Sequence, residues 1–356
     1  MDVFVGVLSY VVFFAISAGT YGVLTLGLNL QWGTTGLFNI GVAGFYALGA
    51  YAAALVAGPP PDTWDGRIFG GFELPFLVGL LAAALVAGVV AFLIGIPTLR
   101  LRADYLAIAT IGIAETIRLV LKNEAWLTNG VWGLQQIPSP LYDVIYGAAN
   151  RFVDTHPEMA PWLQRLIGKA YNWFYLLLVI AVLFLIYRLV KRLVNSPWGR
   201  ILKAIREDES VAAMSGKNVF AYKLQALVLG AMIMGVGGAL YAHFARFISP
   251  NSFEPLYGTF VVWVMLILGG TGNNKGAILG AFVVWGIWAA TDFLTGALPF
   301  TAPQAAAMRV IIIGVLLEAV ILLRPEGLLP ERRRRRRRRR KAGKATPPPP
   351  RSSKSP

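Results

Sequence analysis

Two charged residues, Glu115 and Arg118, interrupt an apolar run that extends from Asp104 to Lys122. Their i, i+3 spacing places both on one face of a helix. Glu115 lies about 16 Å from Asp104 at 1.5 Å per residue, which is close to mid-membrane if the run crosses a bilayer. Charged groups at that depth are usually functional or paired. The pair is a candidate for a polar pathway; the alternatives are an ion pair that locks helix packing and an arginine that extends to the interface.

Three amides, Asn29, Gln31 and Asn39, flank a glycine turn at Gly33 and Gly36. Uncharged amides and exposed backbone at a broken membrane helix could line a passage for a zwitterion, because helix ends offer N–H groups to a carboxylate. Hydrogen bonding between helices is the alternative use of the same amides. A similar turn at 269–275 also leads into a small-residue helix, which indicates either an internal duplication or a shared composition.

The sequence contains no set of catalytic residues. Cysteine is absent, and the two histidines, His156 and His243, are far apart in the chain. No glycine-rich loop that cradles phosphate precedes a lysine and a hydroxyl residue. Thiol chemistry is therefore excluded, no metal site is expected, and any ATP hydrolysis must occur in another chain.

A charged segment at 196–222 separates two long apolar runs. Ser196 and Pro197 form a typical helix start, with a hydroxyl cap and proline in the first turn. Asp208 can cap a second short helix through Ala213, and Gly216 suits its C-terminal stop. We expect two short amphipathic helices that lie across a membrane surface, with the small residues Ala204, Ala212 and Ala213 where a partner could press in; a plain surface loop is the alternative.

The composition predicts a membrane protein made of helices. Of the 356 residues, 56% are hydrophobic and 14% are charged, whereas soluble chains carry roughly a quarter charged residues. The fold class is therefore all-α and polytopic, with about nine transmembrane helices, within a range of roughly 8 to 10. No cleavable signal peptide is visible, because the first apolar run is long and lacks a basic start. The expected spans are 3–30, 36–57, 75–99, 104–122, 171–194, 222–244, 257–269 (short), 276–298 and 305–323.

The charge of the chain is concentrated in its last residues. Residues 331–356 hold 13 Lys/Arg and one Glu, a net +12 of the total +15, and the rest is near balance at +3. We expect a disordered polybasic tail that binds anionic lipid through its arginines, with no specific role in nucleic-acid binding. These arginines include Arg332, Arg336 and Arg340.

The distribution of Lys and Arg sets an expected orientation. The tail, the 196–222 segment and the Arg100/Arg102 turn are the basic connections, so we expect all three on the cytoplasmic side. The same count places the N-terminus and the 123–170 loop outside. Residues 162–167 of that loop could lie flat on the membrane surface.

Several motifs together resemble one transporter family, the LivM-type permeases of branched-chain amino-acid ABC importers. The resemblance covers about residues 20–330 and departs from the family near residue 42 and in 141–170. Its motifs are Gly27-Leu-Asn-Leu, Gly33, Gly36-Leu, Gly41, Phe45-Tyr, Gly49-Ala-Tyr51, Leu99-Arg-Leu-Arg-Ala-Asp-Tyr105, Gly112, Glu115, Arg118, Leu127-Thr, Gly130, Gly133-Leu, Gly199-Arg200, Ala204-Ile-Arg-Glu-Asp-Glu209, Ala212-Ala213, Gly216, Tyr222-Lys-Leu, Gly238-Ala-Leu-Tyr241, Ser249-Pro250, Gly269-Gly, Gly272, Gly276, Gly280-Ala and Arg324-Pro-Glu-Gly-Leu328.

This resemblance implies an ABC importer permease domain over residues 1–330, followed by the tail at 331–356. Residues of about 195–221 would form the coupling loop that docks in a groove of the ATPase subunits. The implied coupling residues are Gly199, Arg200, Ala204, Ile205, Arg206, Glu207, Asp208, Glu209, Ala212, Ala213 and Gly216.

The family also implies partners and a place in the cell. They are a second, LivH-type permease, two ATP-binding subunits that hold ATP and Mg²⁺, and an extracytoplasmic binding protein, in a bacterial inner membrane; this chain itself would hold no cofactor. Transport would proceed by alternating access. The alternatives are import of urea or short amides, a membrane-embedded enzyme acting on lipid-linked substrates, and a stand-alone channel, which would leave the 196–222 segment unexplained.

Overall fold

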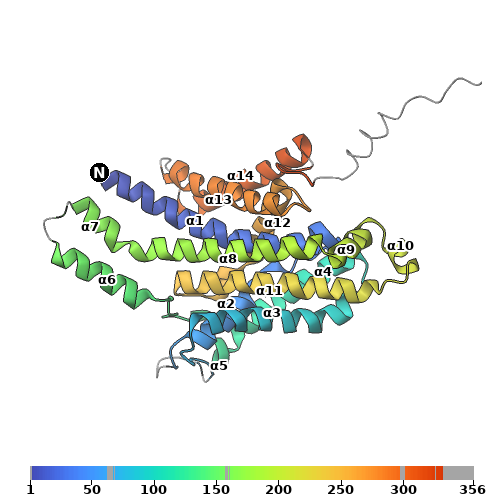
Figure 1. Cartoon of the computed structure of the whole chain (residues 1–356), viewed down its shortest axis with the longest axis horizontal. Coiled ribbons are helices and arrows are strands. Elements are labelled where there is room, and N and C mark those ends of the chain that lie inside the picture. The colour runs from blue at the N-terminus through green and yellow to red at the C-terminus, as the bar shows by residue number, and fades with distance from the viewer. Residues whose placement is uncertain are drawn as a thin grey trace, which may run out of the picture.

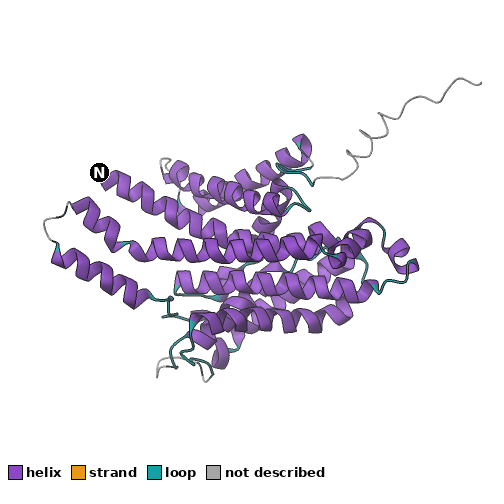
Figure 2. Ribbon diagram, in the orientation of Figure 1, coloured by secondary structure: helices purple, strands orange, loops and turns teal. Residues whose placement is uncertain are grey.

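The protein is a bundle of helices in the computed structural model, which describes residues 2–61, 67, 69–156, 159, 161–296, 301–324 and 326–331 (Figure 1). Within these residues the one β contact is a bridge between Leu134 and Ile248, and the remaining structure is helix and loop (Figure 2). The longer helices are α1 (Asp2–Leu28), α2 (Val42–Ala57), α3 (Phe76–Thr98), α4 (Ala103–Asn123), α8 (Ala170–Asn195), α11 (Val219–Ala245), α13 (Asn274–Gly296) and α14 (Ala302–Leu323). The shorter ones are η1 (Asn29–Thr34), α5 (Ala125–Thr128), η2 (Gly130–Trp132), α6 (Tyr142–Thr155), α7 (Pro161–Gly168), α9 (Pro197–Glu207), α10 (Glu209–Met214), η3 (Pro250–Phe253), η4 (Leu256–Phe260) and α12 (Val261–Gly269).

Four segments of the described chain are long and apolar enough to cross a membrane. They are 5–34 (α1 with the π-helical turn η1), α3, α8 and α11, and three shorter apolar helices lie at 42–57, 256–269 and 303–315. Most of the helices expected from the sequence have bounds within a few residues of the predicted ones. The all-α, multi-span prediction is therefore confirmed.

One expected span begins later than predicted. The sequence suggested a helix from Gly36, but residues 36–41 are not helical and α2 starts at Val42. Gly36 has a φ of +79°, which is outside the range of a right-handed helix. The chain there folds back on η1, because the Leu37 N–H donates to the Gln31 carbonyl at 3.0 Å.

The centre of the bundle depends on close backbone contact. Helix α11 packs against α2 and α3, and α1 packs against α11, α8 and α13. A Cβ atom on Gly49 of α2 would lie 2.2 Å from the carbonyl oxygen of Gly235 on α11. Only glycine fits at this crossing, as is typical of helices that approach closely in lipid.

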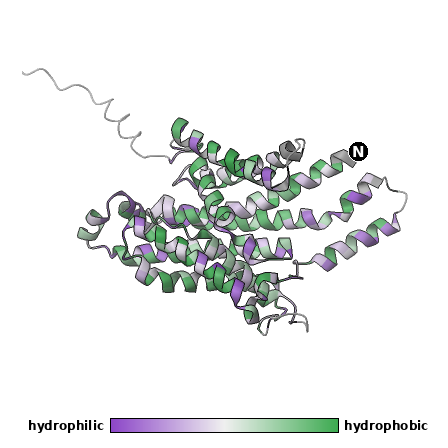
Figure 3. Ribbon diagram, turned by 180° about the vertical axis from the view of Figure 1, so that it is seen from behind, coloured by the Kyte–Doolittle hydropathy of each residue, from purple (hydrophilic) through white to green (hydrophobic). Residues whose placement is uncertain are grey.

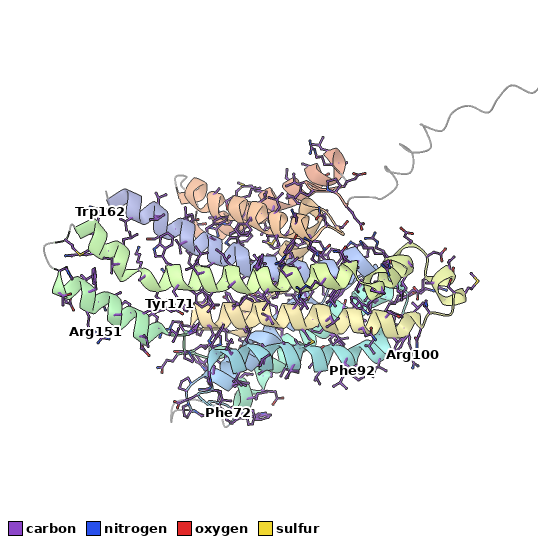
Figure 4. All side chains as sticks on the ribbon, viewed as in Figure 1. Phe72, Phe92, Arg100, Arg151, Trp162 and Tyr171 are labelled. Atoms are coloured by element: carbon purple, nitrogen blue, oxygen red, sulfur yellow. The ribbon has the colours of Figure 1, made fainter. Side chains whose placement is uncertain are left out.

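The connection between α4 and α8 forms helices of its own at one end of the bundle. Helices α6 and α7 extend there (Figure 1), and Trp162 and Arg151 mark them in Figure 4. They carry more hydrophilic residues than the long helices (Figure 3). Residues 162–167, the candidates for a surface segment, belong to α7. The polybasic tail, with Arg332, Arg336 and Arg340, lies outside the described residues.

Candidate functional site

The charged segment between α8 and α11 folds into two capped helices, as its sequence predicts. The Ser196 hydroxyl accepts from the Gly199 N–H at 3.4 Å at the start of α9. The Asp208 carboxylate caps α10 by accepting from the N–H groups of Ser210 at 2.9 Å and Val211 at 3.1 Å. Each cap satisfies N–H groups that a helix start leaves without partners. The segment is therefore a folded element and not a flexible loop.

The charge on the α10 cap is favoured by its own hydrogen bonds. The Ser210 hydroxyl donates to Asp208 at 2.6 Å. That bond, with the Val211 and Ser210 N–H groups, holds the pKa of the Asp208 carboxyl below its ordinary value. Asp208 thus remains ionised, which suits a position at the positive end of a helix.

The two helices are joined to the long helices by short connections on both sides. Ser196 alone separates α8 from α9, and a Cβ on Gly199 would lie 2.4 Å from the Val194 carbonyl oxygen. Gly216 ends α10 at a φ of +74°, and the Asn218 side chain caps α11 by accepting from the Ala221 N–H at 3.1 Å. The helix pair is thus connected to α8 through Ser196 and to α11 through residues 215–218.

One face of the helix pair is buried and the other is open. Leu202, Ile205 and Ala212 are buried, which confirms the predicted apolar face of α9. Ala204 and Ala213 are exposed. A groove of about 460 Å³ runs between the helices, lined by residues that include Arg200, Ala204, Glu207, Asp208, Val211 and Ala212. Two of the small residues therefore line this groove: Ala204 is exposed there and Ala212 is buried.

Arg206 connects α9 to two distant parts of the chain. Its guanidinium donates to the Glu331 carboxylate at 2.7 Å and also to the carbonyl oxygen of Gly33 in η1. The Lys203 ammonium lies 3.2 Å from the other Glu331 oxygen. No sequence pattern marks Glu331 beyond its being the one acidic residue of a basic tail. These bonds tie the helix pair to the broken end of α1.

The three amides predicted near the glycine turn form buried hydrogen bonds. Asn39 Nδ2 donates to Gln31 Oε1 at 2.8 Å, and Gln31 Nε2 donates to the Leu227 carbonyl at 2.8 Å. Asn29 Nδ2 donates to Asn274 Oδ1 at 2.8 Å, and the Gly272 N–H donates to Asn29 Oδ1 at 2.8 Å. Asn29, Gln31 and Asn39 are all 0% exposed. In this conformation they bond helices together, and the two glycine turns seen in the sequence meet.

The pair on α4 stands apart from this network. Arg118 donates to both carboxylate oxygens of Glu115, with an Nε–Oε2 distance of 2.9 Å. The Glu115 side chain is 37% exposed and that of Arg118 is 17% exposed. The bond from Arg206 to the Gly33 carbonyl thus brings α9 to the turn that holds the three amides. Glu115 and Arg118 form a separate ion pair within α4.

Comparisons with known proteins agree on one family. The family described as "Branched-chain amino acid transport system / permease component" matches residues 10–321. The high-affinity branched-chain amino acid permease protein LivM of Escherichia coli (strain K12) is 34% identical over 288 residues, which cover 76% of this chain and 63% of that protein. The chain therefore spans slightly less than two thirds of this relative.

Two further relatives extend the comparison. A probable branched-chain amino acid permease LivM of Methanocaldococcus jannaschii is 25% identical and covers 88% of this chain and 91% of its own length. The permease protein LivH of Salmonella typhimurium is 23% identical and covers 74% of this chain and 79% of its own length. No solved structure gave a significant match.

Proposed function

The chain belongs to the family of branched-chain amino acid transport permeases, and from this we propose that it is the membrane-spanning subunit of an ATP-driven importer of branched-chain amino acids. The observation that carries the proposal is the capped helix pair α9–α10, joined through Ser196 to α8 and through Asn218 to α11. Such an element can convert the movement of a docked partner into tilting of membrane helices, which a flexible loop cannot do.

In the proposed mechanism, two ATPase subunits hold ATP and Mg²⁺ and press on the helix pair when they close. The proposed coupling residues are those of the implied set, from Gly199 to Gly216. The movement passes directly to α8 and α11, and through Arg206 to the Gly33 carbonyl of η1. The long helices then rock between outward-open and inward-open states, as in other alternating-access transporters.

The proposed assembly contains a second permease and an extracytoplasmic binding protein. A LivH protein, which resembles this chain, supports the presence of a related second permease. Helices α9 and α10 and the tail face the cytoplasm in this arrangement, and the arginines Arg332, Arg336 and Arg340 bind anionic lipid. Asn29, Gln31 and Asn39 would contact the pathway only after the helices separate, because these amides are hydrogen-bonded in this conformation. Glu115 and Arg118 would contact it from α4.

The decisive experiment measures ATP-dependent uptake of radiolabelled L-leucine in cells that express this chain with its partner subunits and lack other leucine importers. Ala213→Trp places a large side chain on the exposed face of α10, so we expect uptake to fall at least tenfold while the chain still inserts. Ala148→Trp, an exposed site on α6, is the matched control. Unchanged uptake in Ala213→Trp contradicts the coupling role, and no leucine uptake by the unmodified assembly contradicts the proposed substrate.

A further inference from the structure

A cavity of about 580 Å³ lies at the end of the bundle opposite α9 and α10. Its wall includes the loop before α3, the segment 136–143 and the end of α11. Helix α11 begins next to α10 and is about 40 Å long at 1.5 Å per residue, so the cavity and the helix pair are at opposite faces. Figure 4 shows the same separation along α3, with Phe72 before its start and Arg100 beyond its end. In the proposed orientation the cavity is extracytoplasmic.

Three solvent-exposed side chains of opposite charge line the cavity, and no ion pair joins them in the described part of the chain. The Arg246 guanidinium lies 4.4 Å from the ring centre of Tyr142, and its N–H groups have no hydrogen-bond or ion-pair partner among the described residues. The carboxylates of Glu73 and Asp143 also line the cavity and have no side-chain partner within the described chain. A guanidinium with free N–H groups is suited to bind a carboxylate in two parallel hydrogen bonds.

The backbone around the cavity is held in an unfavourable conformation. Three lining residues that are not glycine have positive φ angles: Glu73 (50°), Gln136 (55°) and Arg246 (59°). Leu141 (56°), between the lining residues Pro140 and Tyr142, is a fourth. The described chain has one other such residue, Asn129. Strained backbone of this kind persists where the surrounding structure fixes it, and it gathers at ligand sites.

A buried histidine adds an unused acceptor to the wall. His243 is 0% exposed, and its Nδ1 lies 2.6 Å from the Pro138 carbonyl oxygen. Since a carbonyl can only accept, Nδ1 carries the proton and Nε2 is left as an acceptor. Nε2 has no partner in the described structure. Buried polar atoms are nearly always hydrogen-bonded, so the cavity wall lacks a hydrogen-bond donor for His243 Nε2.

We propose that this cavity is a binding site for the head group of a free α-amino acid. Arg246 binds the carboxylate, Glu73 and Asp143 bind the ammonium group, and Leu74, Phe76 and Pro138 contact an apolar side chain. The volume falls within the range of roughly 300–1,000 Å³ that small-molecule sites occupy. This assignment rests on the proposed function and makes the cavity the place where the permease receives its substrate.

The test measures binding of radiolabelled L-leucine to the full chain, purified with its partner subunits in lipid nanodiscs and without the binding protein. L-leucinamide, which lacks the carboxylate, and 4-methylpentanoate, which lacks the ammonium group, serve as competitors. Arg246→Asn removes the guanidinium and retains a residue that tolerates positive φ. Asp143→Asn removes one carboxylate. Arg151→Asn and Asp154→Asn, both exposed on α6, are matched controls.

Arg246→Asn should weaken leucine binding about tenfold or more, the usual effect of losing a charged hydrogen bond. It should also reduce the preference for leucine over leucinamide. Asp143→Asn should weaken binding while keeping that preference, and should instead reduce the preference over 4-methylpentanoate. The α6 controls should match the unmodified protein. If Arg246→Asn does not assemble, Asp143→Asn at its exposed position still decides the question.

Several results overturn the assignment. One is that both variants bind leucine with unchanged affinity. Another is that both keep the unmodified protein's preference for leucine over the two competitors. A third is that an assembly that imports leucine does not bind it. Weaker association of the binding protein with unchanged leucine affinity would make the cavity a docking contact instead. If the unmodified assembly imports no leucine in cells, the proposed function fails, and this inference falls with it.

Discussion

Arg206 and Glu331 are 125 positions apart in the chain, and their side chains are joined at 2.7 Å. Arg206 belongs to α9, and Glu331 follows the last helix. Because Arg206 also donates to the Gly33 carbonyl, one guanidinium joins the N-terminal helix, the proposed coupling helix and the C-terminal segment. This connection makes Arg206 the centre of the cytoplasmic face in the proposed orientation.

Replacing Glu331 by glutamine should loosen α9 from the bundle with little loss of stability. Its two ion pairs, with Arg206 and Lys203, are partly exposed, so they should contribute less than about 1 kcal/mol to the free energy of unfolding. We expect a melting temperature close to that of the unmodified protein and fewer leucine molecules imported per ATP hydrolysed. Glu326→Gln, an exposed control, should keep the normal ratio. An unchanged ratio in Glu331→Gln would show that the bond plays no part in coupling.

The Asp208 cap should make α10 sensitive to acid. Its pKa is lowered in the folded chain, so the cap stabilises α10 above the ordinary value of about 4 and is lost as the pH falls through the lowered folded value. Amide exchange at Val211, corrected for its intrinsic rate, should therefore accelerate between pH 5 and pH 3 more than exchange in α8. Asp208→Asn should remove the pH dependence and keep protection, and Asp208→Ala should lose protection at both values. Equal exchange in all three proteins would contradict the capping role.

Asn29 should be important for stability because it joins the two glycine turns. Asn29→Ala leaves Asn274 Oδ1 and the Gly272 N–H without their buried partner, at a cost of about 1–3 kcal/mol for each unsatisfied group. A lower midpoint of thermal unfolding in detergent is the expected result. Asn195→Ala removes an exposed amide bonded only within its own helix and should unfold like the unmodified protein. Similar midpoints for the two variants would mean that the turns are held together in another way.

Two glycines should respond to alanine in opposite ways. Gly49→Ala forces a Cβ against the Gly235 carbonyl and should destabilise the bundle by about 1–3 kcal/mol. Gly112 lies in α4 with no atom within 4 Å of the added Cβ, so Gly112→Ala should stabilise by about 0.5–1 kcal/mol. Unfolding in a denaturant series distinguishes the two signs. A neutral effect at Gly49 would contradict the close crossing of α2 and α11.

Local features of the structure were predictable from the sequence. The Ser196 and Asp208 caps, the stop at Gly216 and the apolar face of α9 depend on residues a few positions apart, and the structure confirms all of them. Most long helices were likewise predictable, because apolar length alone indicates a membrane span. The predicted start of α2 at Gly36 was wrong, because the backbone turn at Gly36 depends on contacts with η1.

Contacts between distant residues were not predictable. The amides near Gly33 are candidates from the sequence alone, yet their partners Asn274, Gly272 and Leu227 come from distant segments of the chain. Glu331 had no local pattern to mark it. The charges and the strained backbone at the cavity belong to separate segments, Glu73, Gln136, Asp143 and Arg246, which only the tertiary fold assembles.

The bond between Arg206 and Glu331 also has a consequence for biosynthesis. A ribosome completes α9 well before it reaches the residue that neutralises Arg206, since 125 positions separate the two. Until Glu331 has been synthesised, the Arg206 guanidinium lacks its carboxylate partner. In the proposed orientation, this bond on the cytoplasmic face can form only after α14 has been synthesised and Glu331 has emerged, so it is among the last contacts of the bundle to form.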